Sequence, residues 1–262
     1  FSFRADGKTV AVVAVDPSSP LTGGAFLGDR IRMQHHTKDS GVFVRSLATR
    51  SDIASAPASI AEVVHAIDAY GFDIILIETI GTGQNDTRAR DLGDICIVVC
   101  APGFGDFVQS AKAGILEISD FLVVNKSDLA EAQDLFHDLA RRFHPDATRH
   151  SLPAVVAVSA RTGSGVKNLY QSLVKKISEL TRSGELLARR RAQFRAELLH
   201  HLRSRIASAV SEQSAQNGSL DRAVSELEKR KLDPLTAAES LWRKYLRSST
   251  GQSAKRSGRR KG

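Results

Sequence analysis

The chain has 262 residues, of which 42% are hydrophobic and 25% are charged, the balance of a globular protein with a sizeable buried core. No run of 18 or more apolar residues occurs, and the first residues lack the apolar stretch of a signal peptide, so we expect neither a membrane span nor a leader. The first residue is Phe1 rather than Met, which indicates a fragment or a processed form.

The net charge of +8 is unevenly distributed. Residues 1–184 carry 19 Lys and Arg against 21 Asp and Glu, whereas residues 185–262 carry 18 against 8. We therefore expect no specific nucleic-acid partner for the first region. The basic second region is either a solvated face or a contact for an acidic partner or polyanion.

Two cysteines, Cys96 and Cys100, stand four residues apart in one apolar run. On a strand their Cα atoms would be about 13 Å apart, which is too far for a disulfide. We expect two small buried side chains and a cytoplasmic protein, since the cytoplasm keeps thiols reduced.

Along residues 1–184, short runs rich in Val and Ile alternate with helical patterns. Such runs are typical of parallel strands covered on both faces. The expected strands are 9–15, 42–47, 73–78, 95–101, 121–125 and 155–159, and the expected helices are 57–70, 107–118, 130–143 and 165–182. This alternation predicts an α/β fold with a doubly wound, mostly parallel sheet.

After residue 184 the strand pattern ends. Residues 185–213, 220–231 and 234–247 have helical patterns, separated by breaks at Gly218 and Pro234. Residues 248–262 hold little to bury and are expected to be disordered. The predicted organisation is an α/β domain at 1–184, a helical region at 185–247 and a disordered basic tail at 248–262.

The strand expected at 121–125 ends in Asn125-Lys126-Ser127-Asp128. Ligands of doubly wound sheets bind at the carboxyl ends of the strands. A carboxylate at Asp128 can accept hydrogen bonds from N1 and N2 of guanine, a donor pair that adenine lacks, so it selects guanine. Asn125 can steady the loop and the stem of Lys126 can cover the base. A polar turn after a strand is the alternative interpretation.

The next strand ends in Ser159-Ala160-Arg161, followed by Thr162-Gly163. This second loop could touch the same base through backbone N–H groups. The three residues are common in proteins, so the prediction depends on their place one strand after Asn125–Asp128.

The strand expected at 73–78 ends in Glu78, followed by Thr79-Ile80-Gly81-Thr82-Gly83-Gln84. A carboxylate at this position can hold Mg²⁺ through water. The glycines permit a loop that approaches the γ-phosphate of a bound nucleotide and rearranges when that phosphate is hydrolysed. Asp16 and Asp29 are further candidates for the metal or its waters. A buried strand-end Glu and a Pro17-containing turn are the alternatives.

The loop Pro102-Gly103-Phe104-Gly105-Asp106 follows another expected strand. It is either a mobile partner-contacting segment or a plain turn.

Phosphoryl transfer by a nucleotide-binding sheet of this kind also needs a G-x-x-x-x-G-K-[ST] loop, whose amides and Lys hold the phosphates. No such pattern occurs in the sequence, so we expect the first strand of the sheet and its phosphate loop to be absent from this chain.

In combination and order, these segments resemble the MeaB/ArgK family of methylmalonyl-CoA mutase-associated GTPases, relatives of the methylmalonic aciduria type A protein. The resemblance covers residues 9–182 well and the helical region loosely. It is carried by residues 13–19, 22–30, 77–84, 102–106 and 125–128.

The resemblance implies a P-loop NTPase fold that binds GTP or GDP with Mg²⁺, in a GTPase chaperone that assists and protects an adenosylcobalamin-dependent methylmalonyl-CoA mutase. It implies homodimerisation through the C-terminal helices and switch segments at 23–33, 78–86 and 103–112. The implied roles are catalysis by Glu78, Asp29 and Gln84, metal binding by Asp16, Asp29 and Glu78, and signalling to the mutase by Gln109 and Lys112.

Two departures from the family pattern stand out. Asn85-Asp86 replace an expected Ser-Glu, which keeps the charge but shortens its reach, and the phosphate loop is missing. A non-hydrolysing interaction module is therefore the alternative function. A metal-delivery GTPase is a third, although His35-His36 and His200-His201 are only doublets, whose side chains do not share a helix face.

Overall fold

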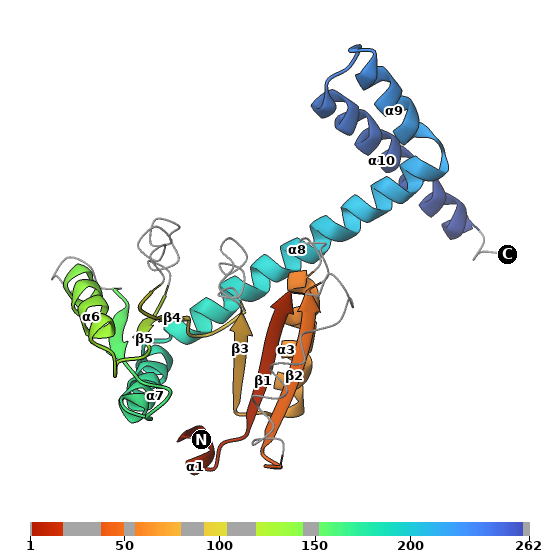
Figure 1. Ribbon diagram of the computed structural model, residues 1–262. Coiled ribbons are helices and arrows are strands. Elements are labelled where there is room, and N and C mark those ends of the chain that lie inside the picture. The colour runs from red at the N-terminus through yellow and green to blue at the C-terminus, as the bar shows by residue number, and fades with distance from the viewer. Residues whose placement is uncertain are drawn as a thin grey trace. The chain divides into compact units, whose positions relative to one another are not determined.

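The structure is a computed structural model, and it describes residues 2–17, 38–49, 56–79, 92–103, 119–143 and 152–258. The chain divides into two compact units, residues 1–193 and 194–262 (Figure 1). The first unit holds all the described strands, and the second is helical.

Two parallel three-stranded sheets form the first unit. The first has the order β2-β1-β3, with β1 at Val10–Pro17, β2 at Val42–Thr49 and β3 at Ile74–Thr79. Helix α3, Ala56–Tyr70, covers one face of it. Alternate residues of β1 form a buried cluster with this helix, composed of Ala11, Val13, Val15, Ile60 and Ile67. The short helix α1, Ser2–Ala5, precedes β1.

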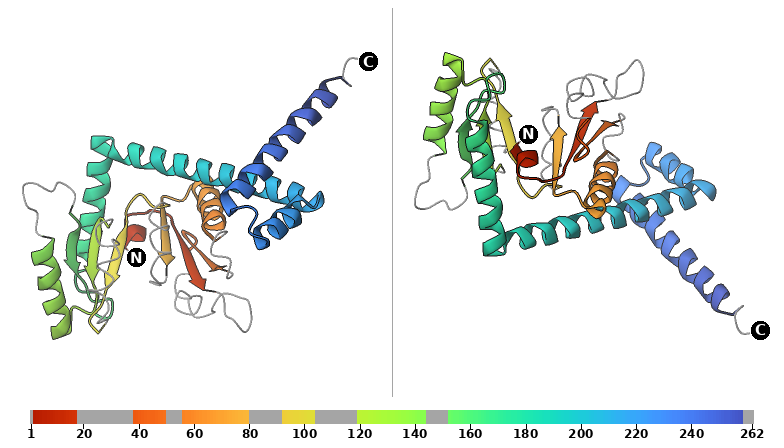
Figure 2. Two further views of the ribbon diagram at one scale, coloured as in Figure 1. Left: turned by 90° about the horizontal axis from the view of Figure 1, so that it is seen from above. Right: turned by 90° about the horizontal axis from the view of Figure 1, so that it is seen from below.

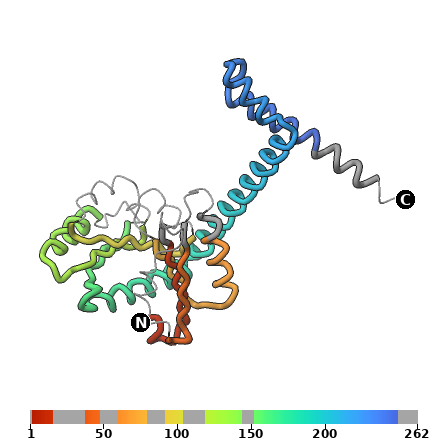
Figure 3. Tube along the Cα trace, turned by 45° about the vertical axis from the view of Figure 1, so that its right-hand side comes forward, coloured from red at the N-terminus to blue at the C-terminus, as the bar shows by residue number. Residues whose placement is uncertain are grey.

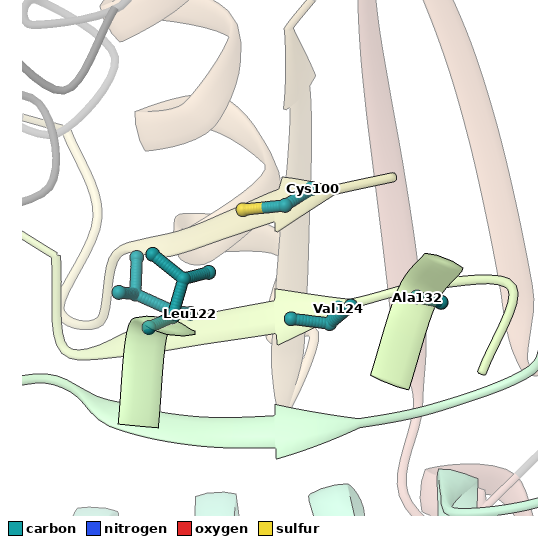
Figure 4. Close-up of a cluster of buried hydrophobic side chains, with 5 residues drawn as sticks. Cys100, Leu122, Val124 and Ala132 are labelled. Atoms are coloured by element: carbon teal, nitrogen blue, oxygen red, sulfur yellow. The ribbon is translucent and has the colours of Figure 1, made fainter. Parts of the chain in front are cut away.

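The second sheet has the order β4-β5-β6, with β4 at Ile97–Cys100, β5 at Phe121–Val124 and β6 at Ala154–Ala157. The central strand β5 is buried on both faces, as expected for a parallel strand covered by helices. Helix α6, Ala130–Arg142, and helix α7, Val166–Ser183, pack on opposite faces (Figure 2). The α6 side of the core contains Cys100, Leu122, Val124, Ala132 and Leu139 (Figure 4).

Helix α8, Glu185–Gln216, begins directly after α7, at Gly184 in a left-handed conformation with φ +77°. Its first turns are bound to the amino ends of β4 and β5. Arg189 Nη1 donates to both carboxylate oxygens of Asp120 at 2.9 and 3.1 Å, and Arg190 forks onto Asp94. Gln193 donates to the Gly93 carbonyl at 2.7 Å. These contacts explain why the division of the chain falls at Gln193, inside α8, rather than at residue 184.

The second unit contains the rest of α8, helix α9 at Ser219–Glu228 and helix α10 at Pro234–Gly258 (Figure 3). Gly218, with φ +64°, makes the turn into α9. Asp233 caps α10, since its Oδ1 accepts the backbone N–H groups of Leu235 and Thr236, both at 3.0 Å. These bonds, with the one from the Thr236 hydroxyl, hold the pKa of Asp233 below its ordinary value.

The predicted α/β fold with a helical C-terminal part is confirmed, and each of the six expected strands is present with slightly different ends. The helix expected at 107–118 lies outside the described residues. Helix α10 differs from the expectation of disorder after residue 247, since it continues to Gly258. Residues 248–258 contain no proline to stop a helix.

Neither cysteine forms a disulfide; Cys100 is buried as expected, whereas Cys96 is only partly buried. Burial raises the pKa of the Cys100 thiol to about 12, so it is a structural residue and not a nucleophile. Among the described helices, none is long and apolar enough to cross a membrane.

Candidate nucleotide-binding site

The loop after β5 is held by the side chain of Asn125. Its Oδ1 accepts the backbone N–H of Lys126 at 2.7 Å and that of Ala160, in the loop after β6, at 3.0 Å. The Asn125 N–H in turn donates to the Cys100 carbonyl at the end of β4, at 2.8 Å. Through its side-chain amide and its backbone N–H, Asn125 therefore joins the carboxyl ends of all three strands of the second sheet.

Lys126 adopts a left-handed backbone with φ +61°, which is uncommon for a residue other than glycine. The turn it makes is fixed on both sides, because Ser127 N–H donates to the Val158 carbonyl at 2.9 Å and Leu129 N–H donates to the Lys126 carbonyl at 2.9 Å. Such strain is found where a site demands a particular loop shape. The side chain of Lys126 is left exposed above the loop.

The loop after β6 turns back on itself around Ser159, which is completely buried. The Ser159 N–H donates to the Ser164 carbonyl, and its own carbonyl accepts the Gly163 N–H at 2.8 Å. Gly165 then starts α7 with φ +74°, so close to β6 that a Cβ atom there would lie 2.1 Å from the Ala157 carbonyl oxygen. Only glycine fits at this position without moving the loop.

Asp128 lies where the two loops meet. Its Oδ1 accepts the Ser159 hydroxyl at 2.5 Å, and its Oδ2 accepts Nε and Nη2 of Arg161 at 3.2 and 2.6 Å. The hydrogen bond from Ser159 and then those from Arg161 lower the pKa of Asp128 to about 2. The carboxylate is therefore ionised at neutral pH and can only accept hydrogen bonds.

The structure thus brings six predicted site residues together at one edge of the second sheet: Asn125, Lys126, Asp128, Ser159, Ala160 and Arg161. An ionised, oriented carboxylate beside exposed loop backbone can accept the two adjacent N–H donors of a guanine edge. The contact between Arg161 and Asp128 was not predicted from the sequence. An Arg four residues after the end of a neighbouring strand is the signal that could have suggested it.

At the first sheet, the structure describes fewer of the predicted residues. Glu78 is exposed near the carboxyl end of β3, and Asp16 lies at the same end of β1, two residues beyond the β1 partner of Glu78, Ala14. Asp29, Gln84, Gln109 and Lys112 lie outside the described residues. Glu78 offers one oxygen ligand, which suits Mg²⁺ because this ion keeps several waters and takes few protein ligands. Among the described residues, no group of three His, Cys, Asp or Glu could enclose a metal.

The tripeptide Gly7-Lys8-Thr9 has the last three residues of a phosphate loop, but it lies before β1 and not between a strand and a helix. Lys8 Nζ donates to Asp73 at 3.3 Å, and Thr9 binds the same carboxylate through its N–H at 2.8 Å and its hydroxyl at 2.9 Å. These bonds also hold the pKa of Asp73 below its ordinary value. The tripeptide therefore joins the amino ends of β1 and β3, whereas Glu78 lies at the carboxyl end of β3.

A solved structure described as an LAO/AO transport system kinase superposes on this fold with a TM-score of 0.64 at 21% identity, over 92% of this chain and 72% of that one. The parallel sheets covered by helices and this likeness define an α/β fold of the kind that the solved structure has.

A family model described as methylmalonyl Co-A mutase-associated GTPase MeaB matches residues 1–215. The chain belongs to this family. A putative GTPase of Pyrococcus abyssi is 36% identical over 247 residues, 93% of this chain and 76% of that protein. GTPase ArgK of Escherichia coli is 32% identical over 215 residues, 75% of this chain and 63% of that protein.

The mitochondrial methylmalonic aciduria type A homolog of Caenorhabditis elegans is 30% identical over 245 residues, 92% of this chain and 61% of that protein. The family predicted from the sequence is confirmed, and its members are named GTPases.

Proposed function

We propose that this chain is the guanine-reading part of a GTP-binding and GTP-hydrolysing chaperone that assists and protects an adenosylcobalamin-dependent methylmalonyl-CoA mutase. The observation that carries the nucleotide part is the carboxylate of Asp128, fixed by Ser159 and joined through Asn125 to three strand ends. The family, whose description names this mutase, supports the partner.

In the proposed complex, Asp128 accepts N1–H and N2–H of guanine, Asn125 holds the two loops together, and Lys126 covers the base plane. Ser159 keeps Asp128 oriented, while Ala160 and Arg161 border the base from the second loop. These roles follow from chemistry that an adenine cannot satisfy, because it would leave the carboxylate unpaired.

Asp128→Asn tests this assignment, because the amide presents a donor where guanine also presents one. We expect the variant to bind GTP about 100-fold more weakly and to prefer xanthosine triphosphate. Calorimetric titration with GTP and with xanthosine triphosphate measures this change in preference. A variant that bound GTP as tightly as the parent would show that another group reads the base.

The phosphates need a loop that this sequence does not contain. Among the described strands, β3 pairs only with β1 and β4 pairs only with β5, yet both expose apolar side chains, with Leu76 42%, Ile97 38% and Val99 63% exposed. Parallel sheets usually have both faces covered, so apolar side chains exposed on β3 and β4 indicate that another element packs against these strands. We propose that an apolar strand bearing the phosphate loop pairs with these free edges and joins the two sheets.

For hydrolysis, we propose that Glu78, Asp16 and Asp29 organise Mg²⁺ and its waters, with Gln84 beside the attacking water. Glu78→Gln should abolish turnover of GTP by the gene product that carries the phosphate loop, while guanosine still binds, because base reading lies on the other sheet. Single-turnover hydrolysis and guanosine titration separate the two effects. Loss of both together would place Glu78 in a structural role.

The contact with the mutase is proposed for the segment 103–112, with Gln109 and Lys112 reporting the nucleotide state. Gel filtration of the chain with an adenosylcobalamin-dependent methylmalonyl-CoA mutase, with GDP or a non-hydrolysable GTP analogue, tests it. We expect complex formation to depend on the nucleotide. If the chain and the mutase did not co-elute with either nucleotide, the partnership would be excluded.

Homodimerisation is proposed through the second unit. Helix α8 exposes an apolar side chain on every turn, with Phe194 57%, Leu198 60%, Leu202 48% and Ile206 45% exposed. Residues four apart share a helix face, so these side chains form one stripe. Leu198→Glu should convert a dimer into a monomer in light-scattering measurements, whereas Arg205→Glu, one residue before Ile206, should not.

A non-hydrolysing interaction module of the same family is the second candidate, and the missing phosphate loop favours it. Calorimetry with GTP on residues 1–262 distinguishes the two. Micromolar binding with measurable turnover would exclude the module. A metal-delivery GTPase is a third candidate, to be tested by equilibrium dialysis with Ni²⁺ or Zn²⁺, where tight stoichiometric binding would favour it.

A further inference from the structure

The carboxylate that should read the base is already engaged by the protein itself. Two carboxylate oxygens offer about four acceptor positions. In the structure, Ser159 takes one position on Oδ1, and Arg161 Nε and Nη2 take two on Oδ2. Arg161 thus fills both positions on Oδ2, but a guanine edge needs one position on each oxygen.

The two protein partners of Asp128 differ in their freedom to move. Ser159 is completely buried, and its hydroxyl also accepts the N–H of Thr162 at 3.2 Å. The side chain of Arg161 is 77% exposed, while that of Asp128 is 19% exposed. Ser159 is therefore fixed and compatible with a bound base, whereas Arg161 can move into solvent and must leave Oδ2 before a base binds.

We propose that Arg161 is a gate on the base-reading carboxylate: its guanidinium occupies Asp128 Oδ2 in the empty site and is displaced by the N–H donors of an entering guanine. This inference rests on the proposed base-reading role of Asp128. The gate keeps the carboxylate paired when no base is present. Only a base with two suitable N–H donors replaces the hydrogen bonds that Arg161 donates to Asp128.

The gate is weak, as a displaceable contact must be. Ion pairs with an exposed partner contribute little because water and salt screen them. We therefore expect Arg161→Ala to bind guanosine about two- to five-fold more tightly than the parent chain. Arg161→Lys keeps the charge but not the fork, and should fall between the two.

Guanosine is the suitable probe because it carries no phosphate, so salt acts on the gate and not on the ligand. Titrations followed by NMR in about 20 mM and about 500 mM NaCl should show the parent chain binding about two-fold more tightly at high salt. Arg161→Ala should show no such gain. Arg141→Ala is the matched control, since Arg141 forms a similar exposed pair with Asp138 at 2.7 Å on α6, away from the site.

The outcomes separate the gate from the function on which it rests. If guanosine binding depends on Asp128 but Arg161→Ala binds equally or more weakly, the gate is wrong and base reading stands. If neither the parent chain nor Arg161→Ala binds guanosine, both the proposed function and the gate are overturned. Tighter binding by Arg161→Ala, absent in Arg141→Ala, supports the gate.

Discussion

An aspartate–arginine pair lies at each end of strand β5. Asp120, just before the strand, pairs with Arg189, and the two side chains are 10% and 25% exposed. Asp128, four residues after the strand, pairs with Arg161, whose side chain is 77% exposed. The chemistry is the same, but the first arginine also binds the Asp94 carbonyl and Glu185, while the second donates only to Asp128 within the part of the chain that the structure describes.

The difference teaches that burial of the arginine decides what such a pair can do. A guanidinium held by several acceptors away from water fixes the start of α8 to the sheet. A guanidinium held by one carboxylate in solvent can be exchanged for a ligand. The same strand thus has an anchoring end and an exchanging end.

The largest effect is expected from a substitution that strains the backbone of the loop after β6, beside the exchanging end of β5. Gly165→Ala places a Cβ atom against the Ala157 carbonyl and forces a left-handed residue, so we expect a loss of about 2–3 kcal/mol in the free energy of unfolding. Gly163→Ala is the control, because φ is +79° there but nothing lies within 4 Å, and it should cost about 1 kcal/mol. Urea denaturation measures both, and equal losses would contradict the close packing at Gly165.

The next effect tests the anchoring end. Arg189→Ala removes the bonds to Asp120 and leaves a mostly buried carboxylate short of a partner, so we expect a loss of about 1–2 kcal/mol in stability. Arg190→Ala removes a more exposed pair with Asp94 and should cost about 0.5 kcal/mol. Arg161→Ala, at the exchanging end, should lower the denaturation midpoint least of the three, because the Arg161 side chain is 77% exposed. A midpoint that fell as far for Arg161→Ala as for Arg189→Ala would remove the distinction.

The smallest effect is on the acidity of Asp128. Its pKa of about 2 lies below the unfolded value of about 3.9, so the stabilisation from its ionised form is complete above about pH 4 and is lost as the pH falls through about 2. Because Ser159 lowers this pKa most, Ser159→Ala should raise it more than Arg161→Ala does. NMR titration of the carboxylate carbon gives both values, and the reverse order would make Arg161 the main partner.

Much of this architecture could be predicted from the sequence, because continuous Val- and Ile-rich runs have few alternatives to buried parallel strands. Asn125, Asp128 and Ser159 could be placed together by the rule that parallel strands end at one edge. The engagement of Asp128 by Arg161 could not, since it depends on the direction of one long, exposed side chain. Nor could the anchoring of α8, because Arg189 and Asp120 are 69 residues apart and no periodic pattern joins them.

The unpaired edges of β3 and β4, among the described strands, have a practical consequence for anyone handling this chain. An apolar parallel strand without a neighbour is a template for the strand of another molecule. Concentrated solutions should therefore become turbid with time, and a low apparent ligand stoichiometry could reflect lost material and not a weak site. Dynamic light scattering before each titration is the check, and a peptide that seats on these edges should also preserve the sample.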